Sequence, residues 1–113
     1  MARVAAVYGD VRRQLEWLVA ALDTDRNNGE VAADLAELAL GIGDLDTALK
    51  ALRAITLLKG PCRMTRAVAF LRQAQIAHRQ GEAQKALVFA RRARAEDAHL
   101  LEATDFLRQI GDA

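Results

Sequence analysis

The residue types that most often carry chemistry are sparse in this 113-residue chain, which contains two histidines and one cysteine. His78 and His99 fall on different expected elements, and no His-x3-His or Cys-x2-Cys spacing typical of a zinc site occurs. Cys62 would need a neighbouring base and an orienting group to act as a nucleophile, and the sequence around it supplies neither. We therefore predict no metal site, no cofactor and no catalytic residues, and do not expect an enzyme.

Both histidines have simpler interpretations. His78 lies in the stretch AQIAHRQG, near the end of an expected helix. A positive imidazole there interacts favourably with the helix dipole, so a structural role is favoured over ligand contact. His99 begins the last expected helix and is expected to be solvated.

Composition favours helices throughout. Hydrophobic residues make up 52% of the chain, aromatic residues 4%, and there is one proline. The net charge of +1 gives no global reason for binding to nucleic acid or to a membrane. The apolar run in the N-terminal MARVAAVYGDVRR is too short for a signal-peptide core or a membrane span. We expect a cytoplasmic protein that does not contact membranes.

A glycine followed by an acidic residue recurs along the chain, at Gly9-Asp10, Gly43-Asp44 and Gly81-Glu82. The second interval is slightly longer than the first, and GPCR at 60–63 is a loop signal that accounts for the extra residues. Such a pair between two apolar-periodic runs is typical of a helix stop followed by a helix N-cap. The recurrence predicts three joints between helices.

Small residues flank the last two joints at matching offsets. Ala48-x3-Leu52 follows Gly43. Two antiparallel helices approach closely where their facing side chains are small. The other matching residues are Ala86 and Ala90 after Gly81, Ala32, Leu35, Ala36 and Ala39 before Gly43, and Phe70, Gln73, Ala74 and Ala77 before Gly81.

This pattern resembles the tetratricopeptide repeat family over residues 1 to about 110, because the interval from Gly9 to Gly43 matches the family period of about 34 residues. The resemblance implies an all-α, right-handed superhelix of antiparallel helix pairs, with about 2.5 repeats and a C-terminal capping helix. The chain departs from the family pattern in having few large aromatics, in lacking the closing proline, and in placing Gln73 where a buried leucine is usual.

We expect one domain, in which residues 1–28 form a partial repeat. Residues 1–8 would end its first helix, and residues 10–23 would form the second, with an under-covered face beside Trp17. We accordingly expect the C-terminal part of a larger repeat protein, or burial of this face by another chain. The rest divides into repeats at 29–61 (helices 30–41 and 44–58) and 64–97 (helices 64–80 and 82–95) and a capping helix at 98–110.

In this family the first helices of the pairs line a concave groove that holds partner peptides. The resemblance therefore implies a non-catalytic protein–protein interaction module, a scaffold or adaptor that binds an unidentified peptide or helix. The residues that match the groove are Asp34, Glu37, Arg72, Gln75 and Arg79. A competing interpretation is that the two acids simply pair with the two arginines. The Lys, Asn and Arg clamp that some members use for acidic C-terminal tails of chaperones is absent.

Two other functions remain open from the sequence. One is self-association, in which the N-terminal helices of two copies pair to give a homo-oligomer. The other is a nucleic-acid-associated domain using Arg91, Arg92 and Arg94. The second is less expected, because Phe89 is the only nearby aromatic residue and nucleic-acid binding favours aromatic side chains for base stacking.

Overall fold

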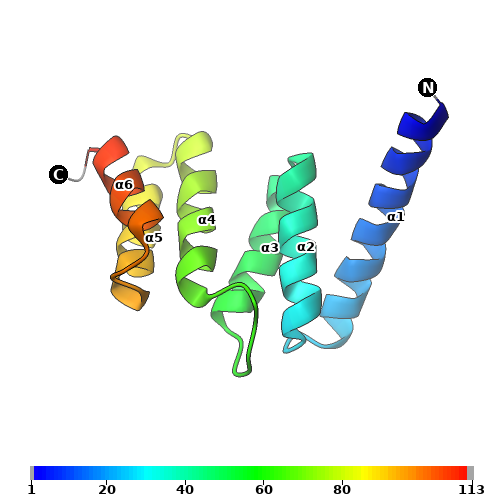
Figure 1. The fold of residues 1–113 in the computed structure, drawn as a ribbon, viewed down its shortest axis with the longest axis horizontal. Coiled ribbons are helices and arrows are strands. Elements are labelled where there is room, and N and C mark those ends of the chain that lie inside the picture. The colour runs from blue at the N-terminus through cyan, green and yellow to red at the C-terminus, as the bar shows by residue number, and fades with distance from the viewer. Residues whose placement is uncertain (1, 112–113) are drawn as a thin grey trace. The chain divides into compact units, whose positions relative to one another are not determined.

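The computed structural model describes the backbone of residues 2–111 and the side chains of residues 10–111 (Figure 1). Every regular element in this part of the chain is a helix, which confirms the all-α prediction. The helices are α1 (Ala2–Thr24), α2 (Gly29–Ile42), α3 (Leu45–Thr56), α4 (Arg66–Arg79), α5 (Ala83–Glu96) and α6 (Leu101–Gln109). None of these helices combines the length and the apolar character that a membrane span needs.

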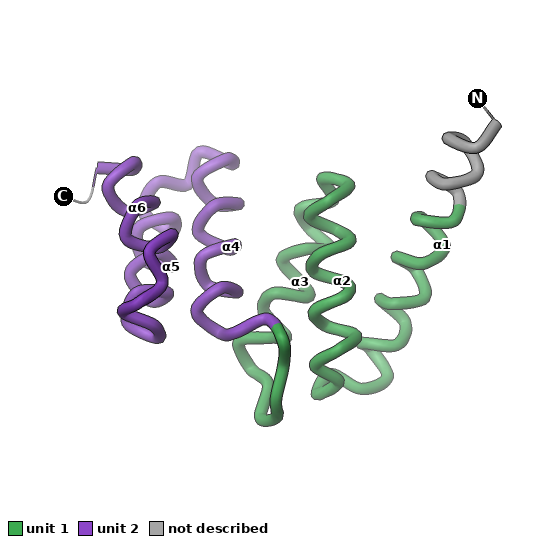
Figure 2. The backbone as a smooth tube through the Cα atoms, viewed as in Figure 1, with its two compact units in different colours: residues 1–63 green, residues 64–113 purple. Residues whose placement is uncertain are grey.

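The helices fall into two compact units (Figure 2). In the first unit, residues 1–63, α1 packs on α2 and α2 packs on α3. In the second unit, residues 64–113, α4 packs on α5 and α5 packs on α6. Each unit is therefore built around one helical hairpin: the first hairpin is α2–α3 and the second is α4–α5.

The same corner joins the helices of both hairpins. Gly43 and Gly81 each have φ 78°, in the left-handed region that a residue with a Cβ adopts only at a cost of about 1–2 kcal/mol. The residue after each glycine donates its N–H to the carbonyl five positions back, at 2.9 Å in the first joint and 2.8 Å in the second. This is the Schellman motif, which ends a helix and satisfies its last carbonyls. The predicted joints at Gly43 and Gly81 are confirmed.

Capping side chains fix where three of the helices begin. Asn28, Asp44 and Thr65 each accept a hydrogen bond from the backbone N–H three residues further on, at 3.2 Å in all three cases. These bonds satisfy N–H groups that have no partner within the helix. The helix expected at 64–80 therefore begins at Arg66, directly after its cap.

The prediction of a joint at Gly9-Asp10 was wrong, because α1 runs without interruption from Ala2 to Thr24. A helix tolerates an interior glycine at a cost of about 1 kcal/mol, so the dipeptide permits a corner without requiring one. The two observed corners connect helices that pack against each other. The interval from Gly9 to Gly43 is therefore not a spacing between corners, and the observed spacing is the longer one from Gly43 to Gly81.

Positions at the same offset from Gly43 and from Gly81 are here called equivalent positions, and several of them are buried in both hairpins. The two hairpins therefore share buried positions, and at three of them both hairpins have alanine, which allows the helices to approach closely. The pairs, each residue at most 5% exposed, are Ala32 and Phe70, Ala33 and Leu71, Leu35 and Gln73, Ala36 and Ala74, Ala39 and Ala77, Ala48 and Ala86, Leu52 and Ala90, and Ile55 and Ala93.

Helix α6 lies within the range predicted for the closing helix and completes the core of the second unit. Its residues Ala103, Phe106 and Leu107 are buried in one cluster with residues of α4 and α5. The ring of Phe106 also meets His78 edge-on, with the ring centroids 5.8 Å apart. His78 therefore has a packing role at the end of α4, and His99 is exposed.

Candidate functional site

The acidic half of the predicted surface lies on α2. Asp34 and Glu37 are both exposed and are three residues apart, which places them on one face of the helix. Arg63 joins them: its Nη2 donates to Asp34 Oδ1 at 2.6 Å and to Glu37 Oε2 at 2.8 Å. These carboxylates raise the pKa of the Arg63 guanidinium further above its ordinary value. The sequence did not single out Arg63 as their partner.

Arg63 reaches these acids because its loop crosses the start of α2. Cys62 Sγ donates to the carbonyl of Gly29 at 3.3 Å, so the half-buried thiol helps to hold the loop in place. A Cβ at Gly29 would come within 2.6 Å of the Pro61 carbonyl oxygen. Glycine at this position therefore allows the close approach that brings Arg63 to α2.

The basic half of the predicted surface lies on α4. Arg72 Nη1 donates to Gln75 Oε1 at 3.0 Å and pairs with Glu102 Oε2 of α6 at 3.3 Å. Arg79 is exposed in the last turn of α4. The structure therefore brings Arg72 and Gln75 together and adds Glu102, which the sequence did not single out.

Asp34 and Arg72 occupy equivalent positions of the two hairpins. Each pairs with an opposite charge from the segment that follows its own hairpin, Arg63 for Asp34 and Glu102 for Arg72. Exposed ion pairs of this kind contribute little to the free energy of unfolding.

The arginines of α5 are partly engaged within the second unit. The guanidinium of Arg92 lies over the ring of Phe70, 4.9 Å from its centroid, and Phe70 stacks on Phe89 with the centroids 6.4 Å apart. This cation–π contact stabilises the folded unit. Binding of nucleic acid by the Arg92 guanidinium would compete with its contact to the Phe70 ring.

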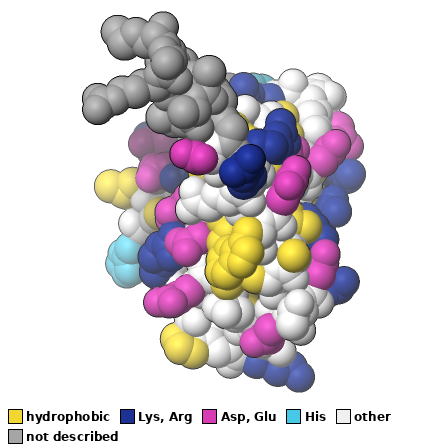
Figure 3. Space-filling view, turned by 90° about the vertical axis from the view of Figure 1, so that its right-hand side faces the viewer, with side chains coloured by type: hydrophobic (Ala, Val, Ile, Leu, Met, Phe, Trp, Pro, Cys, Tyr) yellow, Lys and Arg dark blue, Asp and Glu magenta, His cyan; other side chains and the backbone are white. Residues whose placement is uncertain are grey.

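The apolar residues of α1 face two ways. Leu15, Leu18 and Leu22 are buried, at 3%, 3% and 1% exposed, so the under-covered stripe expected here is closed within the structure. Trp17 is 65% exposed. Figure 3 shows hydrophobic side chains surrounded by acidic and basic ones on one face of the molecule. Among the described side chains of α1, residues 10–24, Trp17 is the large apolar one that is exposed.

The described residues contain no group of three or more His, Cys, Asp or Glu side chains that could hold a metal ion. In comparisons with known proteins, no family model matches the chain and no curated protein matches it. The resemblance to tetratricopeptide repeats therefore remains a prediction based on joints and core spacing.

Proposed function

We propose that the chain is a non-catalytic protein–protein interaction module, a scaffold or adaptor built from tetratricopeptide-like helix pairs that stack as a right-handed superhelix. The recurrence of the hairpin carries the proposal: Gly43 and Gly81 form the same corner, and several equivalent positions are buried in both hairpins. Repeated hairpins present equivalent exposed positions at intervals, and an extended peptide or a helix can bind along such a series.

The proposed binding residues are those of the first helix of each hairpin, namely Asp34 and Glu37 on α2 and Arg72, Gln75 and Arg79 on α4. Their positions are held by regular helices, so binding requires little ordering of the module. Both acidic and basic groups are present, and the weak ion pairs at Arg63 and Glu102 can give way to those of a partner. A partner with charges of both signs fits this set.

Capture of proteins from a cell extract tests the assignment. We expect the Arg72→Glu, Arg79→Glu double variant to recover at least about tenfold less of the partner than the parent chain, because reversed charges repel the groups that the arginines bind. Quantitative mass spectrometry of the captured proteins measures the change.

The matched control is Arg94→Glu, Arg108→Glu, which reverses two exposed arginines elsewhere in the second unit and should leave recovery unchanged. Glu102→Gln frees Arg72 from its ion pair without removing the arginine, so it should maintain or raise recovery. Equal recovery by the Arg72→Glu, Arg79→Glu variant and the parent chain would contradict the assigned surface.

A second candidate function is self-association through α1, and the exposure of Trp17 favours it. A large aromatic side chain that is 65% exposed is typical of residues that become buried at protein interfaces. In this case two copies pair through α1, and the module serves to join chains.

The chain's single tryptophan reports directly on this contact. If α1 mediates self-association, the mass from light scattering rises with concentration, and the emission of Trp17 shifts to the blue as the indole leaves water. Trp17→Glu should remain a monomer over the same range. A parent chain that is monomeric at every concentration excludes this candidate and leaves the binding surface on α2 and α4 unaffected.

A further inference from the structure

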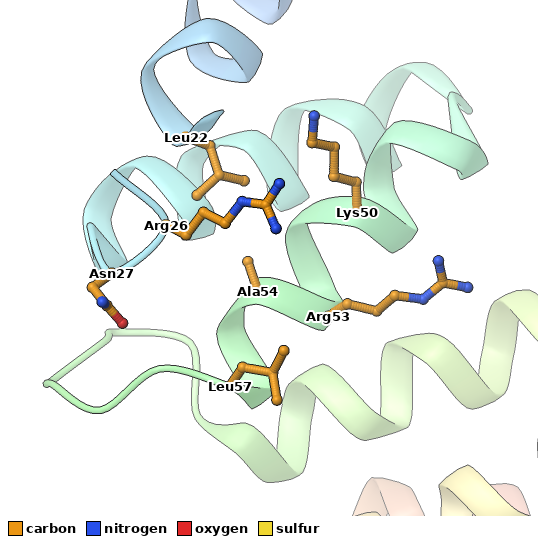
Figure 4. Close-up of a pocket in the computed structure, with 7 residues that line it drawn as sticks. All are labelled: Leu22, Arg26, Asn27, Lys50, Arg53, Ala54 and Leu57. Atoms are coloured by element: carbon orange, nitrogen blue, oxygen red, sulfur yellow. The ribbon is translucent and has the colours of Figure 1, made fainter. Parts of the chain in front are cut away.

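A hollow of about 630 Å³ opens between the end of α1 and α3, within the first unit (Figure 4). Leu22 and Ala54 contribute apolar surface to it, and Arg26, Arg53 and Leu57 also line it. Its volume lies within the range of about 300–1,000 Å³ that is common for ligand sites. It involves neither α2 nor α4, so it is separate from the binding surface proposed above.

The hollow carries positive charge that the described part of the chain does not balance. Lys50 also lines it, but its Nζ is paired with Asp23 at 2.6 Å. The guanidinium groups of Arg26 and Arg53 make no ion pair or hydrogen bond with any other described residue. Figure 4 shows Arg26 reaching from the turn after α1 towards α3, the helix that carries Arg53. Two arginines are therefore available to an anionic ligand.

The apolar residues that line the hollow are aliphatic. Leu57, at the end of α3, is 77% exposed, and Leu22 and Ala54 lie deeper in the hollow, buried and half-buried. Among the residues that the structure describes, no aromatic side chain lines the hollow, whereas single-stranded nucleic acids are held largely by stacking on aromatic rings. An aliphatic surface beside two arginines instead matches a ligand that has an aliphatic side chain next to carboxylates.

We propose that this hollow binds a short acidic peptide segment, with its aliphatic side chain on Leu57 and Ala54 and its carboxylates paired with Arg26 and Arg53. Arginine suits this role, because its planar guanidinium donates two parallel hydrogen bonds to one carboxylate. The surface on α2 and α4 takes no part in this contact. An experiment can therefore contradict one of the two proposed sites and leave the other unaffected.

The test titrates the intact chain with a short fluorescent peptide of alternating Glu and Leu and follows the fluorescence anisotropy. Peptides of alternating Lys and Leu, and of alternating Glu and Ser, serve as matched probes. We expect the Glu/Leu peptide to bind at least about tenfold more tightly than either control, and its affinity to fall as salt screens the carboxylate–arginine pairs.

Two variants locate the site. Arg26→Glu, Arg53→Glu should lose at least about tenfold in affinity for the Glu/Leu peptide, whereas the charge-matched Arg94→Glu, Arg108→Glu should retain it. Leu57→Ala, which truncates a side chain that the fold leaves exposed, should lose about three- to tenfold. Thermal unfolding followed by circular dichroism verifies that each variant is folded.

Three results would overturn the proposal. One is unchanged peptide affinity in the Arg26→Glu, Arg53→Glu variant. Another is binding of the Lys/Leu peptide with the same affinity as the Glu/Leu peptide, since this would show that the carboxylates do not contribute to binding. The third is tighter binding of a single-stranded oligonucleotide, or of vesicles of anionic lipid, in a manner that needs Arg26 and Arg53 but not Leu57.

Discussion

Replacing Leu52 by alanine is expected to lower the free energy of unfolding by about 3 kcal/mol. The side chain is completely buried in the first hairpin, at 0% exposed. Truncation removes its packing contacts and leaves a cavity that the neighbouring helices close only in part. Since a domain of this size has a total stability of about 5–15 kcal/mol, the loss is a large fraction of the whole. Urea unfolding followed by circular dichroism measures it.

Leu101→Ala is the matched control, because it makes the same chemical change at a residue that is 73% exposed. Its effect should stay within about 0.5 kcal/mol. If both variants lose the same free energy, Leu52 does not occupy the tightly packed position that the structure gives it.

The equivalent position in the second hairpin shows that the effect of an alanine at the position of Leu52 depends on the side chains packed around it. Ala90 is also 0% exposed, although it has a much smaller side chain. The second hairpin has the larger residue at another shared position, with Phe70 where the first hairpin has Ala32. The two cores therefore share buried positions but fill the positions of Leu52 and Ala32 with side chains of different size in the second hairpin.

The helices and the two corners could be predicted because their signals are local. A left-handed corner is favoured at glycine, and an aspartate or threonine cap marks a helix start within a few residues. Gly9-Asp10 has the same residue types as Gly43-Asp44 and yet lies inside a helix. The difference is the packing of the flanking helices, which a dipeptide does not encode.

The candidate sites could be predicted only in part. Helical spacing was enough to place Asp34 beside Glu37 and Arg72 beside Gln75. Arg63 is 29 residues from Asp34 in sequence, and Glu102 is 30 residues from Arg72. Arg63 is placed by the loop that crosses the start of α2, and Glu102 by the packing of α6. The hollow beside Leu57 gave no signal in the sequence, because its residues come from a turn and from a distant helix.

Gln73 is the one buried polar side chain among the residues described, at 3% exposed, and its Nε2 has no hydrogen-bond partner there. A buried donor without a partner costs about 1–3 kcal/mol, because it has given up its bonds to water. The equivalent position in the first hairpin is Leu35, which is 0% exposed. The surroundings of this position therefore accommodate a leucine in one of the two hairpins.

Gln73→Leu is accordingly expected to raise the free energy of unfolding by about 1–3 kcal/mol, because leucine fills a similar volume and has no donor to satisfy. For a domain of this length, each kcal/mol corresponds to about 4 °C in Tm, so differential scanning calorimetry resolves the change. Gln84→Leu makes the same substitution at an exposed site of α5 and should stay within about 0.5 kcal/mol. If Gln73→Leu instead lowers Tm, the amide is satisfied in solution by ordered water, and the polar group stabilises the core of α4.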